Sequence, residues 1–212
     1  MTTQPSDDDV RVPDVALRLA IAFLDRIGLA PELVDALPAS SFLLGVRITR
    51  GRLLLTPDCP ASNLLHEAGH LACLPPAYLE SVDGDVSGAI RAMFAHLHTL
   101  DLEPDHPLMR AALQCSDPEA TAWAWAAGLA SCLAPADIIQ DTEYAGDGAS
   151  LRCMLSTGHY VGIHGLAHAG LCRLPRQPGG YPGMHRWLQD ATPVSSVPQP
   201  YPPTFPISPS RA

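Results

Sequence analysis

The spacing of apolar and polar residues along the chain predicts helices over most of its length. In residues 13–27 the apolar side chains recur about every 3.6 positions. Pro13 and Asp14 are typical of a first helical turn, and Gly28 is typical of a helix end. The sequence therefore predicts an amphipathic helix here. Its expected apolar face comprises Val15, Leu19, Ala22, Phe23 and Ile27.

The segment after this helix predicts a small β unit. Residues 43–49 and 52–56 are rich in Leu, Val and Ile, and they flank a turn at Arg50 and Gly51. A helix is expected next at 61–74, with Ser62 or Asp58 as its cap and Pro75 after its end. The fold class expected from these elements is α+β, mostly helical, with a β-hairpin before the helix at 61–74. Further helices are expected at 88–100, 119–133, 135–141, 149–156 and 184–189.

The length of 212 residues suits one domain with short extensions. We expect a domain over 11–192, a disordered acidic segment at 1–10 and a disordered Pro-rich tail at 193–212. Residues 120–136 carry no charge, but the stretch is shorter than the roughly 20 residues that span a membrane, so a buried helix is expected. The acidic N-terminus is unlike a secretory signal and the six cysteines form no C-x-x-C pair. Both features favour a cytoplasmic protein with reduced thiols.

Charge and composition narrow the possible functions. The net charge of −9 argues against a nucleic-acid partner, because such partners are bound by clustered cations. All 13 basic residues are arginines, so chemistry that needs a lysine is excluded, including the phosphate-binding P-loop and Schiff-base catalysis. The chain also lacks the G-x-S-x-G motif of many serine hydrolases. Carboxylates, histidines, thiols and metal ions remain as sources of reactivity.

The strongest candidate site is the segment His66-Glu67-Ala68-Gly69-His70. Two histidines four residues apart lie on one face of a helix, where both imidazoles can reach one metal ion. Glu67 stands beside the first of them, in the position of a general base acting on water at that metal. Burial of these polar groups without a partner would cost several kcal/mol, and a metal ion removes that cost. We therefore expect a zinc site with His66 and His70 as ligands.

Catalytic zinc sites commonly use three protein ligands, so a third must come from elsewhere in the chain. Glu119 is the expected one, because it begins an otherwise uncharged, apolar helix. Alternatively, Glu119 complements the dipole of that helix, although Asp117 could do so as the cap and leave Glu119 for the metal. The competing ligands are His96, His98, Asp101 and Asp117. Cys73 or Cys115 could also complete a closed, purely structural zinc site.

The H-E-A-G-H motif and the later helix Glu119-Ala-Thr-Ala-Trp-Ala-Trp-Ala-Ala, followed by Leu-Ala-Pro, resemble those of the ImmA/IrrE-type zinc peptidases. The resemblance covers roughly residues 40–140. It implies a gluzincin-like, zincin-type fold and metallopeptidase activity on a protein or peptide. No membrane partner is expected, because the uncharged stretch is too short to span a membrane. By the same resemblance His66, His70 and Glu119 bind zinc, and Glu67 is the catalytic base.

The expected reaction is hydrolysis of an amide bond, in which Glu67 removes a proton from water and passes it to the leaving amine. A further donor to the oxyanion is common in such sites. Tyr144, His159 and Tyr160 are candidates for this role, since each lies in the Gly-rich stretch after the helix that begins near Glu119. The competing hypotheses are a zinc-stabilised regulatory or binding module without turnover, and a metal-free interaction protein.

Overall fold

A computed structural model describes residues 13–38 and 43–192. Within them the fold is α+β, with one three-stranded sheet and a larger helical part, as the sequence predicts at this coarse level. The expected disordered ends, residues 1–10 and 193–212, lie outside the described residues.

The first helix, α1 (Val15–Arg26), begins where predicted, and the Asp14 side chain caps it by accepting a hydrogen bond from the backbone N–H of Leu17 (2.7 Å). The predicted apolar face is wrong in part: Val15 is 63% exposed and Leu19 is 40% exposed. The buried side chains form a second apolar stripe on the same helix, offset from the predicted one. This stripe is the buried one because it packs against the next helix. The buried side chains of α1 are Leu17, Ala20, Phe23 and Leu24.

The sheet contains β1 (Glu32–Leu33), β2 (Val46–Thr49) and β3 (Arg52–Leu55) in the order β1-β3-β2. The antiparallel hairpin of β2 and β3 was predicted, and its turn residues Arg50 and Gly51 both have positive φ, 47° and 72°. The parallel pairing of β1 with β3 was not predicted. A strand of two residues is too short to show an alternation of apolar and polar side chains. The sequence therefore could not predict β1, which is identified by its pairing with β3.

The helix α2 (Ala61–Cys73) carries the H-E-A-G-H motif and has nearly the predicted bounds. Its predicted caps are wrong: the cap residue is Pro60, which makes no side-chain hydrogen bond to the helix. Ser62 instead donates to the Glu143 carboxylate (2.6 Å), and Asp58 accepts from the Thr56 hydroxyl (2.6 Å). Ser62 thus ties the first turn of α2 to a segment 81 residues later.

The remaining elements are mostly short helices. Two helices were not predicted from the sequence: one begins at Pro107, and the other spans residues 161–168. The helix expected at 184–189 is absent from the described chain, and Met184 instead forms an isolated bridge with Cys172. In chain order these elements are η1 (Pro76–Ser81), α3 (Val86–Leu97), α4 (Pro107–Ala112), α5 (Asp117–Ala130), α6 (Pro135–Ile138), η2 (Tyr144–Gly146), α7 (Gly148–Ser156) and α8 (Val161–His168).

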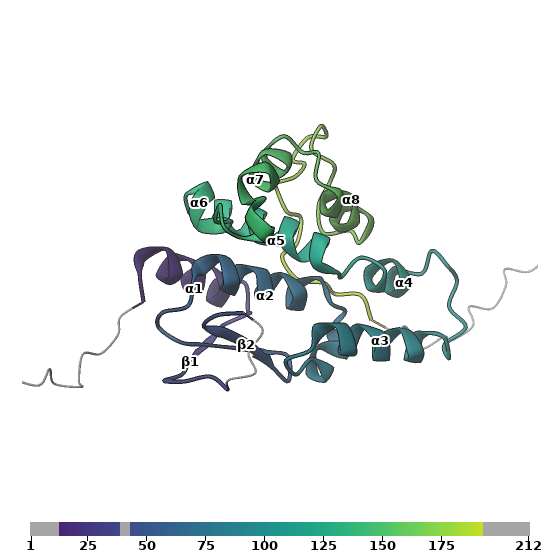
Figure 1. Ribbon diagram of the computed structural model, residues 1–212. Helices are drawn as coiled ribbons and strands as arrows, with labels where there is room; N and C mark the ends of the chain where they lie inside the picture. Colours follow the sequence, from purple (N-terminus) through teal and green to yellow (C-terminus); the bar gives the residue numbers. More distant parts are fainter. Residues whose placement is uncertain (1–12, 39–42, 193–212) are drawn as a thin grey trace, which may run out of the picture.

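The helix α5 lies between α2 on one side and the group α6, α7 and α8 on the other (Figure 1). It is the buried helix predicted from the uncharged stretch, and the side chains of both Trp123 and Trp125 are buried. Glycines allow this close packing. A Cβ on Gly69 of α2 would lie 2.5 Å from the Ala120 carbonyl oxygen, and one on Gly162 of α8 would lie 1.8 Å from that of Pro118. Among the described residues, no helix is long and apolar enough to cross a membrane.

Residues 171–192 follow α8 and run back along α5 toward α2, the yellow trace of Figure 1. The Trp123 indole N–H donates to the Trp187 carbonyl (2.8 Å), and the Gln189 N–H donates to the Ala72 carbonyl (2.8 Å). The segment therefore links α5 with α2.

Candidate metal centre

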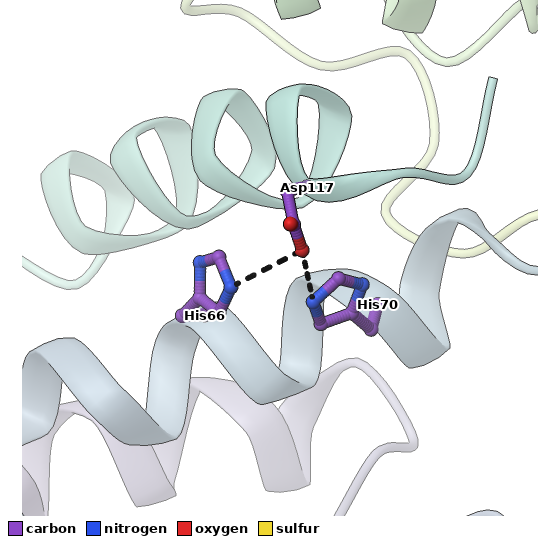
Figure 2. A group of neighbouring side chains, drawn as sticks. All are labelled: His66, His70 and Asp117. Carbon is purple, nitrogen blue, oxygen red and sulfur yellow. Dashed lines mark ion pairs between the residues drawn. The ribbon is translucent and has the colours of Figure 1, made fainter. Parts of the chain in front are cut away.

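The two motif histidines project from α2 toward the first turn of α5 (Figure 2). Their imidazole rings are 4.8 Å apart between centroids and meet edge to face. The helix places them one turn apart on the face that meets α5, as the spacing of four predicts. His66 is 18% exposed and His70 is 7% exposed, so both rings are largely removed from solvent.

The carboxylate that meets these rings belongs to Asp117, the first residue of α5. Its Oδ1 atom lies 3.2 Å from Nε2 of His70 and 3.9 Å from Nε2 of His66 (Figure 2). In a tetrahedral zinc site with bonds of about 2.0–2.2 Å, ligand atoms lie about 3.3–3.6 Å apart. One potential ligand atom from each of the three residues lies within 4.8 Å of the others. Two imidazoles and a carboxylate at these separations fit a divalent transition metal with small adjustments.

Glu119 was predicted as the third ligand, but it is not part of the cluster that could hold a metal ion. Its Oε2 accepts hydrogen bonds from the backbone N–H (3.2 Å) and the hydroxyl (2.7 Å) of Ser116. Its Oε1 lies against α8, where a Cβ on Gly165 would be 2.0 Å from it. The roles expected for the two acids are therefore exchanged: Glu119 helps to cap α5, and Asp117 faces the histidines.

Glu67 is 8% exposed and lies on the buried α2. Burial raises the pKa of its carboxyl group, the nearby His70 lowers it, and the charge of Asp117 raises it further. A raised pKa makes a carboxylate a stronger base, as general-base catalysis requires. Glu67 was predicted for that task from its place in the motif.

The protonation states suit metal binding, since a histidine must be neutral to be a ligand. Burial lowers the pKa of His66 to about 4, and His70 adds to this effect, whereas Asp117 opposes it. His66 is thus neutral near pH 7, and its contact with Asp117 is not an ion pair there. The hydrogen bond from His70 lowers the pKa of Asp117, which keeps this carboxylate ionised.

Tyr144 contacts the second nitrogen of His66. Its hydroxyl lies 3.3 Å from Nδ1 of His66 and 3.0 Å from the hydroxyl of Thr121 on α5. Tyr144 and Ala145 both have positive φ, 54° and 59°, which is uncommon away from glycine. Such backbone strain gathers at functional sites. Thr121 was not predicted for the site, because only the fold brings it to Tyr144.

Unlike Nδ1 of His66, the Nδ1 atom of His70 has no hydrogen-bond partner among the described residues, and it is buried. Buried polar atoms are rarely left unpaired, and such exceptions cluster at functional positions. The ring therefore directs only its Nε2 atom at a polar partner, Asp117.

A cavity of about 570 Å³ opens beside the cluster, and His66 and Asp117 form part of its wall. Tyr144 and Tyr160, two of the predicted oxyanion donors, also line it, whereas His159 does not and is exposed. Burial raises the pKa of Tyr160, so its hydroxyl keeps its proton at neutral pH.

The other proposed ligands lie apart from this cluster. His96 instead pairs through Nδ1 with the Tyr78 hydroxyl (3.0 Å). Cys73 and Cys115 are buried free thiols and are not members of the cluster. Among the described residues, the group that could hold a metal consists of His66, His70 and Asp117. Comparisons with known protein families, curated proteins and solved structures find no match for this chain.

Proposed function

We propose that this chain is a zinc-dependent hydrolase of amide bonds in a protein or peptide, with a zincin-like active site. The observation that carries the proposal is the convergence of His66, His70 and Asp117, near enough to the buried Glu67 of α2 for the charges of His70 and Asp117 to act on its carboxyl group. Two histidines and one carboxylate make a common ligand set of catalytic zinc, which leaves a coordination position open. The H-E-A-G-H motif and its resemblance to the ImmA/IrrE-type peptidases support the same activity.

Each residue has a separate task in this proposal. His66, His70 and Asp117 would hold the metal, which when bound supplies Lewis acidity and a water of lowered pKa. Glu67 accepts the proton of the attacking water and returns it to the leaving amine. Tyr144 orients His66 through its Nδ1 atom. Tyr160, in the cavity wall, is available as a hydrogen-bond donor to the substrate oxyanion.

A second candidate function is a regulatory or binding module in which the metal only stabilises the fold. Its supporting observation is that Asp117 already joins the two central helices, through direct contacts with the histidines of α2. In such a module Glu67 has no chemical task, which makes Glu67 the residue that separates the two functions.

The test is metal content by mass spectrometry, followed by cleavage of a denatured protein substrate. We expect about one zinc ion per wild-type chain. We also expect Glu67→Gln to retain the zinc and to lose at least about 100-fold of the cleavage rate, since general bases contribute about 10²–10⁴-fold.

The outcomes are distinct. Equal cleavage by Glu67→Gln and wild type would rule out the proposed mechanism. Zinc in both proteins with cleavage in neither would favour the binding module. Iron instead of zinc would keep the ligand set, since two histidines and a carboxylate also bind Fe(II), but would contradict the hydrolase.

A further inference from the structure

We infer that the cavity beside the metal centre binds an uncharged apolar side chain of the substrate, next to the amide bond that is cut. This inference rests on the proposed function, because it identifies the substrate class of the same site. The cavity and the centre are continuous, since His66 and Asp117 belong to both. A substrate group bound there would therefore lie beside the reacting atoms.

The wall of the cavity is apolar in its larger part. Its apolar side chains come from the start and middle of α5, the end of α6 with the residue after it, and the segment before β2. Pockets that bind small molecules are lined in this way, with a few polar groups that orient the ligand. The apolar residues of the wall are Leu43, Pro118, Ala124, Ile138 and Ile139.

The charged groups in the wall favour a neutral ligand. None of the described residues that line the cavity is an arginine, so no cationic side chain of the wall could pair with an acidic group of the substrate. The two carboxylates in the wall already have partners. Glu143 accepts from the Ser62 hydroxyl (2.6 Å) and the Gln140 N–H (3.0 Å), and Asp117 contacts the histidines. A basic side chain would thus lose hydration and would have to compete with the Ser62 hydroxyl for Glu143 and with the histidines for Asp117, which is unfavourable.

The size of the cavity agrees with this assignment. Its volume of about 570 Å³ falls within the range of about 300–1,000 Å³ typical of ligand sites. A leucine or phenylalanine side chain fits, together with part of the adjoining backbone. Burial of such a side chain from water increases affinity by about 10- to 100-fold.

The test measures binding, so that it does not depend on turnover. The probes are N-acetyl amino-acid hydroxamates, whose hydroxamate group chelates zinc and whose side chain is Phe, Leu, Ala, Asp or Lys. Calorimetry with the zinc-loaded protein should show Phe and Leu probes binding at least about tenfold more tightly than the Ala probe. The Asp and Lys probes should bind no better than Ala.

Two substitutions in the wall locate the binding site, each with a matched control. Ala124→Leu fills part of the cavity and should remove most of the preference for Phe, whereas Ala130→Leu, on the exposed end of the same helix, should not. Leu43→Glu brings a charge into the wall. It should weaken the Phe probe about tenfold and strengthen the Lys probe. Its control is Leu44→Glu, since Leu44 is 70% exposed and is not in the wall.

Leu43 is only half-buried, so its variant tests the proposal even if Ala124→Leu fails to fold. Equal binding of all five side chains, or a preference for Lys or Asp, overturns the assignment of the cavity while leaving the zinc site intact. An absence of zinc overturns the proposed function instead. In that case the amides of the same amino acids, titrated into the metal-free protein, report on the cavity alone.

Discussion

Ser116, Asp117 and Glu119 divide two tasks at the start of α5. The segment Ser116-Asp-Pro-Glu119 has the S-x-x-E pattern, in which the glutamate accepts a hydrogen bond from the backbone N–H of the N-cap residue, here Ser116. That pattern is visible in the sequence and would have assigned Glu119 to the cap. Asp117, one residue into the helix, is then the acid left for the metal. Its shorter side chain reaches the histidines because α5 crosses α2 at Gly69.

Zinc affinity should separate the two acids. Asp117→Asn removes a charged ligand and should weaken zinc binding by at least about 100-fold, since even the hydrogen-bond partners of ligands account for about 10–100-fold. Glu119→Gln keeps a side chain suited to the cap, and should leave zinc affinity unchanged and stability within about 1 kcal/mol of wild type. Competition with a chromophoric chelator measures both. The opposite order of effects would restore Glu119 as the third ligand.

Tyr144 is expected to act on the metal through His66. Tyr144→Phe removes the hydroxyl that lies 3.3 Å from Nδ1 of His66 and should weaken zinc binding by about 10–100-fold. Tyr160→Phe is the matched control, since Tyr160 also lines the cavity but, within the described part of the chain, makes no hydrogen bond with His66. It should lower the cleavage rate and leave zinc affinity unchanged. If both variants bind zinc as wild type does, Tyr144 has no part in holding His66.

At the scale of elements, the site depends on how closely α2 and α5 approach. Gly69 lies between the two motif histidines and Ala120 lies one turn into α5, so their contact brings His70 and Asp117 together. The Ala-rich sequence of α5 permits close packing on both of its sides, against α2 and against α8. The chemistry of the site and the packing of the fold thus share one contact.

Gly69→Ala tests this dependence. Its Cβ would lie 2.5 Å from a backbone oxygen, so the helices must separate, at a cost of about 1–3 kcal/mol. The same shift should move Asp117 and weaken zinc binding. Gly88→Ala in α3 is the control, because its nearest neighbour at 2.6 Å is the end of the flexible Asp85 side chain. That variant should be neutral or up to about 1 kcal/mol more stable. Urea unfolding curves of similar midpoint for the two variants would refute the role of Gly69.

At the scale of the whole molecule, the buried apolar residues form one cluster that includes side chains from α1, the sheet, α2, α5 and α8. Four cysteines contribute to this burial, whereas Cys132 and Cys153 are exposed. Burial raises the pKa of Cys59 and Cys115 to about 12 and that of Cys172 to about 11. Thiols that keep their proton are poor nucleophiles, so the buried ones should be unreactive in the folded protein.

Counting of reactive thiols with a disulfide reagent should therefore give two per chain in the folded, metal-free protein and six after denaturation. If residues 11–192 form one domain, the four buried thiols should become reactive together, in one transition with increasing urea. A subset that reacts at lower urea would show that part of the chain unfolds independently. Mass spectrometry of the labelled peptides identifies which thiols react.

The sequence alone determined what depends on near neighbours in the chain. The spacing of His66 and His70, the position of Glu67, the β-hairpin and the main helices all follow from local patterns. The uncharged stretch also predicted the burial of α5 correctly. The buried face of α1 was wrong in part because two apolar stripes compete on that helix, and local spacing does not choose between them.

The tertiary structure decided what depends on contacts between distant residues. It pairs β1 with β3, selects the face of α1, and assigns Asp117 and Glu119 to different partners. It also brings Tyr144 to His66 across 78 residues. These choices rest on which surfaces pack together, and a residue's chain neighbours carry little information about packing. A local motif can therefore identify two ligands of the candidate metal site, while the third is set by the crossing of two helices.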